Sequence, residues 1–477
     1  MRASLRSFLF PLGLAVLLSC GDDEPAAPTT VFVTADASCP PTTTGGGSGG
    51  SSAQDANSTP DAGAPDPFMI QAQGMLEEGR KTFRYETFGD EAFWGDTLKL
   101  HQAIAGAANG GVGAGVPPMT ALAVGLKVDS DALPPAVVAA IKAGQVSLTD
   151  PASTLALLKL NAVLGVTGKF DAAGTLVGMG IQCALCHSTV DDSFAPGIGH
   201  RLDGWANRDL NVGAIVSLAP NLAPVATLLG VDETTLKAVL ASWGPGKFDA
   251  AVFLDGKAFQ TDGKTSAAVL IPPAFGLAGV NLHTYTGWGS MTYWNAFVAN
   301  LEMHGKGTFY EPRLGAVGGD GGAYFPIAVK SGAMNARTDT DLVTPKLANL
   351  QLYQLAIPAP TPPAGSFDAA AATRGQAVFA GAGKCATCHV PPLFTEPGYN
   401  SHAPAEIGID DFQASRSPDR RYRTTPLKGL FSHAKGGFYH DGRYATLEAV
   451  VDHYDTFGTL GLTPAQKSDL VQYLKSL

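Results

Sequence analysis

The residues with the clearest chemistry are two copies of the pattern C-x-x-C-H, at 183–187 and 385–389. Two thiols at this spacing can form thioethers with the vinyl groups of a haem, and the histidine that follows can bind the iron. The sequence therefore predicts two covalently bound c-type haems. The candidate attachment and iron-binding residues are Cys183, Cys186, His187, Cys385, Cys388 and His389.

Other chemistries of paired cysteines fit this pattern less well. The four cysteines could make one structural zinc site, and a single C-x-x-C could be a redox dithiol. Both interpretations leave the histidine after the second cysteine unexplained, in both copies. The roughly 200 residues between the two pairs also fit poorly with a compact zinc ribbon. Haem attachment explains all six residues.

The elements that must position these haems are predicted to be short. Glycine (57 residues) and proline (33 residues) interrupt most periodic segments, so we expect short helices joined by long irregular loops. The predicted fold class is mainly α, with two cytochrome c-like haem domains and an extra N-terminal helical region. The best helical segments before the first haem motif are 71–83, 96–108, 134–143 and 151–164.

The last part of the chain has the order of a cytochrome c domain. A proline-rich linker precedes an alanine-rich helix at 369–380, the second haem motif and a final helix. Thr463 and Gln466 make a capping box for that final helix, with Pro464 at its first position. The predicted parts of the chain are a signal peptide at 1–19, a flexible tether at 20–67, an N-terminal helical region at 68–180, a first haem domain at 181–357, the linker at 358–366 and a second cytochrome c domain at 367–477.

The N-terminus has the features of an exported protein. Arg2 and Arg6 precede an apolar run at 8–18, which is typical of a secretory signal and too short for a retained membrane span. The run ends in L-L-S-C at 17–20, which resembles the signal of bacterial lipoproteins and implies acylation of Cys20. An ordinary cleaved signal with a chance cysteine is the alternative. We expect a periplasmic protein that contacts the membrane through a lipid anchor.

The charge balance limits the partners. The formal net charge is −10, so the sequence has no basic footprint for nucleic acid. An acidic surface favours a positively charged small redox protein, or another respiratory electron donor or acceptor.

Beyond the haem motifs, longer segments resemble the bacterial di-haem cytochrome c peroxidase and MauG superfamily. The most specific likeness is at 423–451, which contains F-Y-H-D-G at 438–442. It implies that His440 belongs to the surroundings of the second haem. After the first haem motif, G-I-G-H at 197–200 is similar to a family segment that carries a distal iron ligand. That likeness implies that His200 binds the first iron, and a surface histidine is the alternative.

A further segment implies residues for catalysis. Residues 287–303 are similar to a family succession in which a tryptophan lies between the haems and a glutamate lies over the iron. By this resemblance, Trp288 or Trp294 is the intervening tryptophan and Glu302 is the distal acid. A buried carboxyl group suits peroxide chemistry, because desolvation raises its pKa toward the working range. A solvated helix residue is the alternative for Glu302.

The second haem departs from the peroxidase branch of the superfamily. In that branch a methionine fourteen residues after the signature histidine binds the iron, but Tyr454 stands there and no methionine follows Met334. The MauG branch has a tyrosine ligand at this position, so the resemblance implies that Tyr454 binds the second iron. A phenolate stabilises oxidised iron. His453 as the ligand, or a Tyr454 that only packs, are the alternatives.

These observations predict an exported di-haem c-type cytochrome that acts as an oxidoreductase. Electrons would pass between the two haems, and the first would reduce hydrogen peroxide or carry out a MauG-like high-valent oxidation. A non-catalytic electron carrier is one alternative. A haem oxygenase or dehydrogenase for an organic substrate is another, since the region at 68–180 could shape a substrate pocket.

Overall fold

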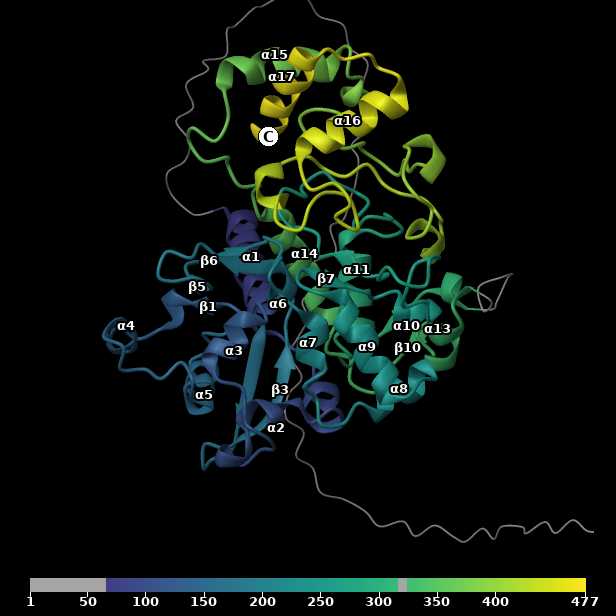
Figure 1. The fold of residues 1–477 in the computed structure, drawn as a ribbon. Coiled ribbons are helices and arrows are strands. Elements are labelled where there is room, and N and C mark those ends of the chain that lie inside the picture. Colours follow the sequence, from purple (N-terminus) through teal and green to yellow (C-terminus); the bar gives the residue numbers. More distant parts are fainter. Residues whose placement is uncertain (1–65, 316–323) are drawn as a thin grey trace, which may run out of the picture. The chain divides into compact units, whose positions relative to one another are not determined.

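The helices of this chain are short, as the glycine and proline content predicts. The computed structural model describes residues 66–315 and 324–477, which belong to one compact unit (Figure 1). The predicted signal peptide, Cys20 and the tether up to residue 65 lie outside these residues. The α-helices are α1 (Pro67–Tyr85), α2 (Leu100–Ala105), α3 (Pro118–Ala123), α4 (Pro135–Lys142), α5 (Pro151–Lys159), α6 (Ala184–His187), α7 (Val212–Val216), α8 (Ala223–Leu229), α9 (Glu233–Trp243), α10 (Val252–Asp255), α11 (Met291–Phe297), α13 (Pro326–Ser331), α14 (Leu347–Ala356), α15 (Ala369–Ala380), α16 (Leu447–Gly458) and α17 (Pro464–Lys475).

The β-structure of the described residues consists of five two-stranded pairs. The pairs are β1 (Val128–Asp129) with β5 (Ile198–Gly199), β2 (Val166–Phe170) with β3 (Leu176–Ile181), β4 (Ser188–Val190) with β6 (Arg201–Asp203), β7 (Lys247–Phe248) with β8 (Val269–Leu270) and β9 (Phe309–Tyr310) with β10 (Asn335–Ala336). Two π-helical turns, η1 (Ala92–Thr97) and η4 (Val298–Glu302), add to the helical content. The expectation of a mainly α fold is confirmed, whereas its division into two haem domains stays a prediction.

The helix predictions before the first haem motif have different outcomes. Segments 71–83 and 134–143 correspond to α1 and α4, and the segment that begins at Pro151 ends earlier than predicted, at Lys159. The single helix predicted at 96–108 is wrong. The chain there forms η1, α2 and a short 3-10 turn, because Lys99 adopts a left-handed conformation with φ +60° between the first two.

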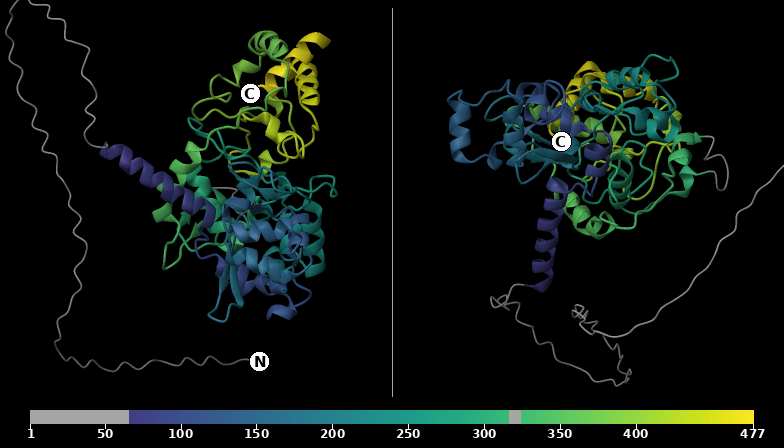
Figure 2. Two further views of the ribbon diagram at one scale, coloured as in Figure 1. Left: turned by 90° about the vertical axis from the view of Figure 1, so that its left-hand side faces the viewer. Right: turned by 90° about the horizontal axis from the view of Figure 1, so that it is seen from below.

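The first helix packs against a helix that is distant in the sequence. α1 packs against α14, and Gly79 allows this contact, because a Cβ atom there would lie 2.0 Å from the carbonyl oxygen of Asn349. In Figure 2, α1 is the long purple helix. No helix within the described ranges is long and apolar enough to cross a membrane.

The C-terminal helices follow the sequence prediction closely. α15 covers the predicted 369–380, and α17 begins at Pro464 with the predicted capping box between Thr463 and Gln466. The two helices pack against each other, with the Phe379 and Tyr473 rings 5.2 Å apart between centroids. Because both helices carry strong local start signals, their positions could be found without knowledge of the tertiary structure.

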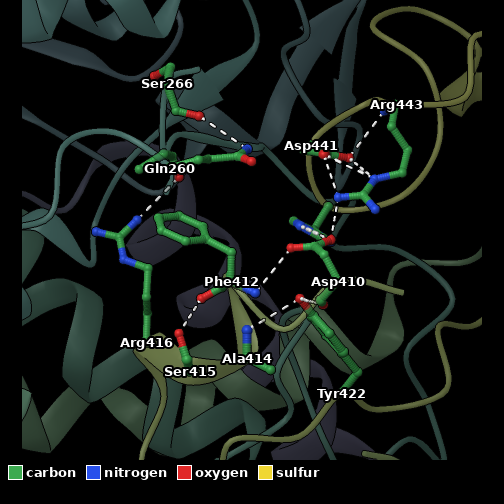
Figure 3. Close-up of polar contacts among 12 residues, drawn as sticks. Gln260, Ser266, Asp410, Phe412, Ala414, Ser415, Arg416, Tyr422, Asp441 and Arg443 are labelled. Carbon is green, nitrogen blue, oxygen red and sulfur yellow. Dashed lines mark hydrogen bonds and ion pairs between the residues drawn. The ribbon is translucent and has the colours of Figure 1, made fainter. Parts of the chain in front are cut away.

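A buried cation ties the segment after the second haem motif to residues before α11. The Arg416 guanidinium donates to Asp255, with 2.8 Å between Nε and Oδ2, and its Nη1 lies 3.0 Å from Oδ1 of Asp249 (Figure 3 shows Arg416). The carbonyls of Lys257 and Ala267 accept two further hydrogen bonds from it. The side chains of all three charged residues are almost completely buried.

Replacement of Arg416 by methionine should therefore destabilise the protein strongly. The variant leaves Asp249 and Asp255 buried without their partner, so we expect the free energy of unfolding to fall by about 3–5 kcal/mol. Chemical denaturation of the haem-loaded protein measures this change. Arg374→Met is the control, because the ion pair of Arg374 with Asp469 is exposed and should contribute little. Equal losses in the two variants would contradict this account of Arg416.

Candidate haem sites

The first haem motif lines an apolar cavity. Cys183 directly precedes α6, which carries Cys186 and His187, and all three residues line this cavity, called cavity 1 here. The hairpin β2–β3 supports α6 from one side. Gly165, with φ +74°, passes so close to the helix that a Cβ atom would lie 2.1 Å from Cα of Leu185. The sequence analysis missed this hairpin, although V-T-G-K-F and L-V-G-M-G-I have strand-like composition.

His187 is oriented as a metal ligand. Its Nδ1 lies 3.1 Å from the carbonyl oxygen of Pro272, and a carbonyl can only accept, so Nδ1 carries the proton and Nε2 is free. Burial lowers the pKa of His187 to about 4, which keeps the ring neutral. A neutral imidazole with a fixed tautomer is the form that binds iron.

The second haem motif lines a separate cavity, called cavity 2. Cys385, Cys388 and His389 lie on its wall, with further lining residues from α15, α16 and α17. Nδ1 of His389 lies 3.1 Å from the carbonyl oxygen of Phe394, so this histidine repeats the orientation of His187. Burial also lowers the pKa of His389. In both motifs the imidazole is therefore neutral, and its Nδ1 donates a hydrogen bond to a backbone carbonyl.

Cavity 2 fits a haem because two arginines that line it have N–H groups without hydrogen-bond partners in the described residues. Nε and Nη1 of Arg208 and Nη1 of Arg423 have no hydrogen-bond partner in the described part of the chain. Burial lowers the pKa of both side chains, that of Arg423 to about 10, because an unpaired charge is costly away from water. The two propionate carboxylates of a haem would supply the missing partners. The apolar walls of cavity 1 suit the porphyrin face of the other haem.

Comparison with known proteins agrees with this picture. No family model matches the chain. It is 26% identical over 238 residues to the methylamine utilization protein MauG of Methylorubrum extorquens, a match that covers 43% of this chain and 63% of MauG. The resemblance to the di-haem cytochrome c peroxidase and MauG superfamily is thereby confirmed. The chain spans less than two thirds of the length of this relative.

Two solved structures were also found. Hydrazine synthase of Kuenenia stuttgartiensis is 16% identical, with 48% of this chain and 86% of that chain covered and a TM-score of 0.26. A MauG-like protein associated with microbial copper homeostasis is 18% identical, with 47% and 76% covered and a TM-score of 0.29. At these TM-scores the superpositions add nothing to the sequence match with MauG.

Glu302 lies at the first site. It ends the π-helical turn η4 and lines cavity 1 together with His187. Burial raises the pKa of Glu302 to about 7 and is the sole cause of the shift. An acid with this pKa exchanges protons near neutral pH. The structure thus brings together the glutamate and the haem motif that lie more than 100 residues apart in the sequence.

His200 lies away from both cavities. Its side chain is 62% exposed, and its Nδ1 lies 2.8 Å from Oδ1 of Asp131, which is equally exposed. Asp191 accepts a hydrogen bond from the His200 amide. The structure therefore gives no support for His200 as an iron ligand, and its position matches the alternative of a surface histidine.

The tryptophans predicted to lie between the haems line neither cavity. Trp288 and Trp294 are 5.1 Å apart between ring centroids and belong to an aromatic cluster with Tyr293, Phe297 and Phe309. This cluster forms a packed core, so the structure gives no support for either tryptophan as the residue between the haems. The resemblance at 287–303 also named Glu302, and the structure places Glu302 in cavity 1.

A different tryptophan, Trp205, is next to a residue that bonds the first haem motif, and its ring contacts a residue that lines cavity 2. The amide of its neighbour Gly204 donates to the carbonyl of His187 at 2.8 Å. The Trp205 ring contacts Phe275, which lines cavity 2, at 6.2 Å, and Phe431 at 5.9 Å. Sequence reasoning missed Trp205 because only the tertiary contact between residues 204–205 and 274–275 reveals its place.

Tyr454 and His440 both line cavity 2, whereas His453 does not. Tyr454 lies on α16 and is largely buried, which raises its pKa. The His440 ring stacks on Tyr422, with 5.4 Å between centroids. Close to His440, Arg443 contacts Asp410 and Asp441, and the hydroxyl of Tyr422 accepts from the amide of Ala414 (Figure 3). The position of Tyr454 is compatible with the ligand role that the superfamily implies.

The place of Trp205 leads to a prediction about electron transfer. An indole ring relays an electron hole more readily than a benzene ring, so Trp205→Phe should slow electron transfer between the haems by about tenfold or more, or about 1.4 kcal/mol in activation free energy. Rapid partial reduction of the haem-loaded protein, followed by absorbance, measures the rate. Trp288→Phe is the matched control and should leave it unchanged. Slower electron transfer in Trp288→Phe together with an unchanged rate in Trp205→Phe would contradict the role of Trp205 and favour Trp288.

Proposed function

We propose that the protein is an exported di-haem c-type oxidoreductase that reduces hydrogen peroxide. Each C-x-x-C-H motif holds one haem covalently, and the haem in cavity 1 is the site of the reaction. The observation that carries this proposal is the position of Glu302 in the apolar cavity of His187, where desolvation raises its pKa to about 7. The match to MauG, which covers 43% of this chain, supports a di-haem redox enzyme rather than a simple carrier.

The residues of cavity 1 have separate tasks in this proposal. A haem supplies an iron that binds peroxide and exchanges electrons. His187, whose ring is oriented by its bond to the Pro272 carbonyl, would be the protein ligand of that iron. Glu302, protonated below pH 7, gives its proton to the oxygen that leaves as water. The apolar walls keep bulk water away, which strengthens these interactions.

Cavity 2 has the properties of an electron entry site. Arg208 and Arg423 would neutralise the haem propionates there, and a protein-borne electron donor would deliver electrons to this haem. Electrons then pass toward cavity 1 by way of Phe275 and Trp205. We propose a positively charged small redox protein as the donor, since the chain carries a net charge of −10. A lipid on Cys20 would hold the enzyme at the periplasmic face of a membrane.

One observation favours a second candidate, oxidation of an organic substrate. Most walls of cavity 1 come from residues before the haem motif, including Phe93, Trp94 and Leu100 of the N-terminal region. This region could admit an apolar molecule beside the haem. Oxygen or peroxide consumption that depends on added apolar substrates would favour this function over peroxide reduction alone.

Peroxide turnover should depend on Glu302 and on pH. Its folded-state pKa of about 7 is raised above the ordinary value, so the donating form is complete at low pH and turnover should fall as the pH rises through about 7. Glu302→Gln cannot donate, and we expect turnover to fall by about 10²–10⁴ and the step near pH 7 to disappear. Reduction of peroxide by a chemically reduced haem-loaded protein measures both.

Asp90→Asn provides the matched control for this variant. Asp90 is also a buried acid, with a pKa raised to about 9 by burial, but it does not line cavity 1. This variant should keep both turnover and its pH dependence. Unchanged peroxide turnover in Glu302→Gln would refute the proposed role of Glu302.

A further inference from the structure

A second ionisable residue, His304, shares cavity 1 with Glu302. It follows the π-helical turn η4 by two residues and lines the same cavity as His187. Sequence reasoning gave His304 no role. Its presence is notable because nearly all other walls of cavity 1 are apolar.

Few other titratable groups face this cavity. Cys183 and Cys186 belong to the haem motif, and Asp90 faces Cys183 from outside the cavity. Lys127 lines the cavity, but its Nζ lies 2.7 Å from Oδ2 of Asp209, which neutralises it. Glu302 and His304 are therefore the two groups that remain available for proton transfer.

The loop that carries His304 is held firmly. The indole N–H of Trp94 donates to the Met303 carbonyl at 3.0 Å, and the amide of Gly305 donates to the Ala299 carbonyl at 2.8 Å. The His304 ring stacks on Phe93, with 3.6 Å between centroids. His304 itself has φ +61°, in the left-handed region that few residues other than glycine adopt and in which asparagine, aspartate and histidine are the most frequent of these. Such strained residues cluster at functional sites because their surroundings must enforce them.

The imidazole of His304 is free to act as a base. Among residues 66–315 and 324–477, neither ring nitrogen has a hydrogen-bond partner, and burial alone lowers its pKa to about 4. Burial moves the pKa of Glu302 in the opposite direction, to about 7. Between these values the carboxyl group holds a proton to give and the imidazole has a lone pair to accept one. Two groups whose pKa values are pushed apart in one site can divide the acid and base roles.

We propose that His304 is the catalytic base of the first haem site and that Glu302 is its complementary acid. This inference rests on the proposed peroxide reduction. His304 would accept the proton of one peroxide oxygen while Glu302 gives its proton to the other. The O–O bond would break with two electrons that the redox donor supplies through the haems. One water would leave with the proton of Glu302, and the second would form with the proton from His304 and one from solvent. A second solvent proton would restore Glu302, so that one hydrogen peroxide, two electrons and two protons give two waters.

Cyanide binding tests the base directly, without turnover. Hydrogen cyanide must lose its proton when it binds ferric haem, so removal of the base should slow association. We expect His304→Asn and His304→Gly to lower the association rate of cyanide with the oxidised haem-loaded protein by about 10² or more. Both replacements tolerate the positive φ, so the loop should keep its conformation. Added imidazole should restore the rate in His304→Gly.

Two controls separate a base from a structural role. Carbon monoxide binds reduced haem without proton transfer, so its association rate should stay the same in both variants. His101→Asn changes another buried histidine, which lines neither cavity, and should leave cyanide binding unchanged. Equal cyanide rates in the wild type and in His304→Gly would overturn the inference, as would an equal slowing of carbon monoxide.

The same experiment separates this inference from the proposed function. Slower cyanide binding in a protein that does not turn over peroxide would support His304 as a base and refute peroxide reduction. Peroxide turnover with unchanged cyanide and peroxide rates in His304→Gly would refute the base and leave the proposed function standing.

Discussion

The hydrogen bond from Nδ1 of His187 to the Pro272 carbonyl is the contact on which the two sites depend. It fixes the tautomer of His187, the predicted ligand of the first iron, and leaves Nε2 free to bind a metal. Pro272 also lines cavity 2, so one residue serves both sites. Next to it, the Ala274 amide donates to the Gly204 carbonyl at 2.7 Å, which sets Trp205 against Phe275. The segment at 272–275 is thus a short covalent and hydrogen-bonded connection between the haem sites.

Desolvation gives the two cavities different chemistry. In cavity 1 it acts on an acid and a base without counter-charges, so the pKa of Glu302 rises and that of His304 falls. In cavity 2 it acts on the guanidinium groups of Arg208 and Arg423, whose charge a haem carboxylate can balance. The first arrangement suits proton-coupled chemistry on a small molecule, and the second suits an electron-transfer haem.

The sequence predicted best what depends on local patterns. The haem motifs, α15 and α17 follow from short residue patterns and helix start signals, and the structure places the motifs at two cavities. Glu302 was found through a resemblance, although its burial could not be read from the sequence. Trp205 and His304 were missed because the roles proposed for them depend on contacts between distant segments and on the conformation of one loop. The hairpin β2–β3 was missed because glycines interrupt both strands, although their other residues favour strands.

Contacts between distant segments also shape the described chain. The N-terminal region supplies walls of cavity 1, and Arg416 from the C-terminal part binds Asp249 and Asp255. Segments that are far apart in the sequence therefore line the same cavity or share the same buried ion pairs. Residue patterns can locate each segment, but which segments meet is decided by packing over long sequence distances.

The most direct test is an electronic and EPR spectrum of the oxidised haem-loaded protein, recorded before and after one equivalent of hydrogen peroxide. The account predicts two haems per chain, of which one is high spin and changes its spectrum with peroxide while the other changes only through electron transfer. Two low-spin haems that are unaffected by peroxide, both in the oxidised protein and after addition of one electron, would contradict it and indicate an electron carrier.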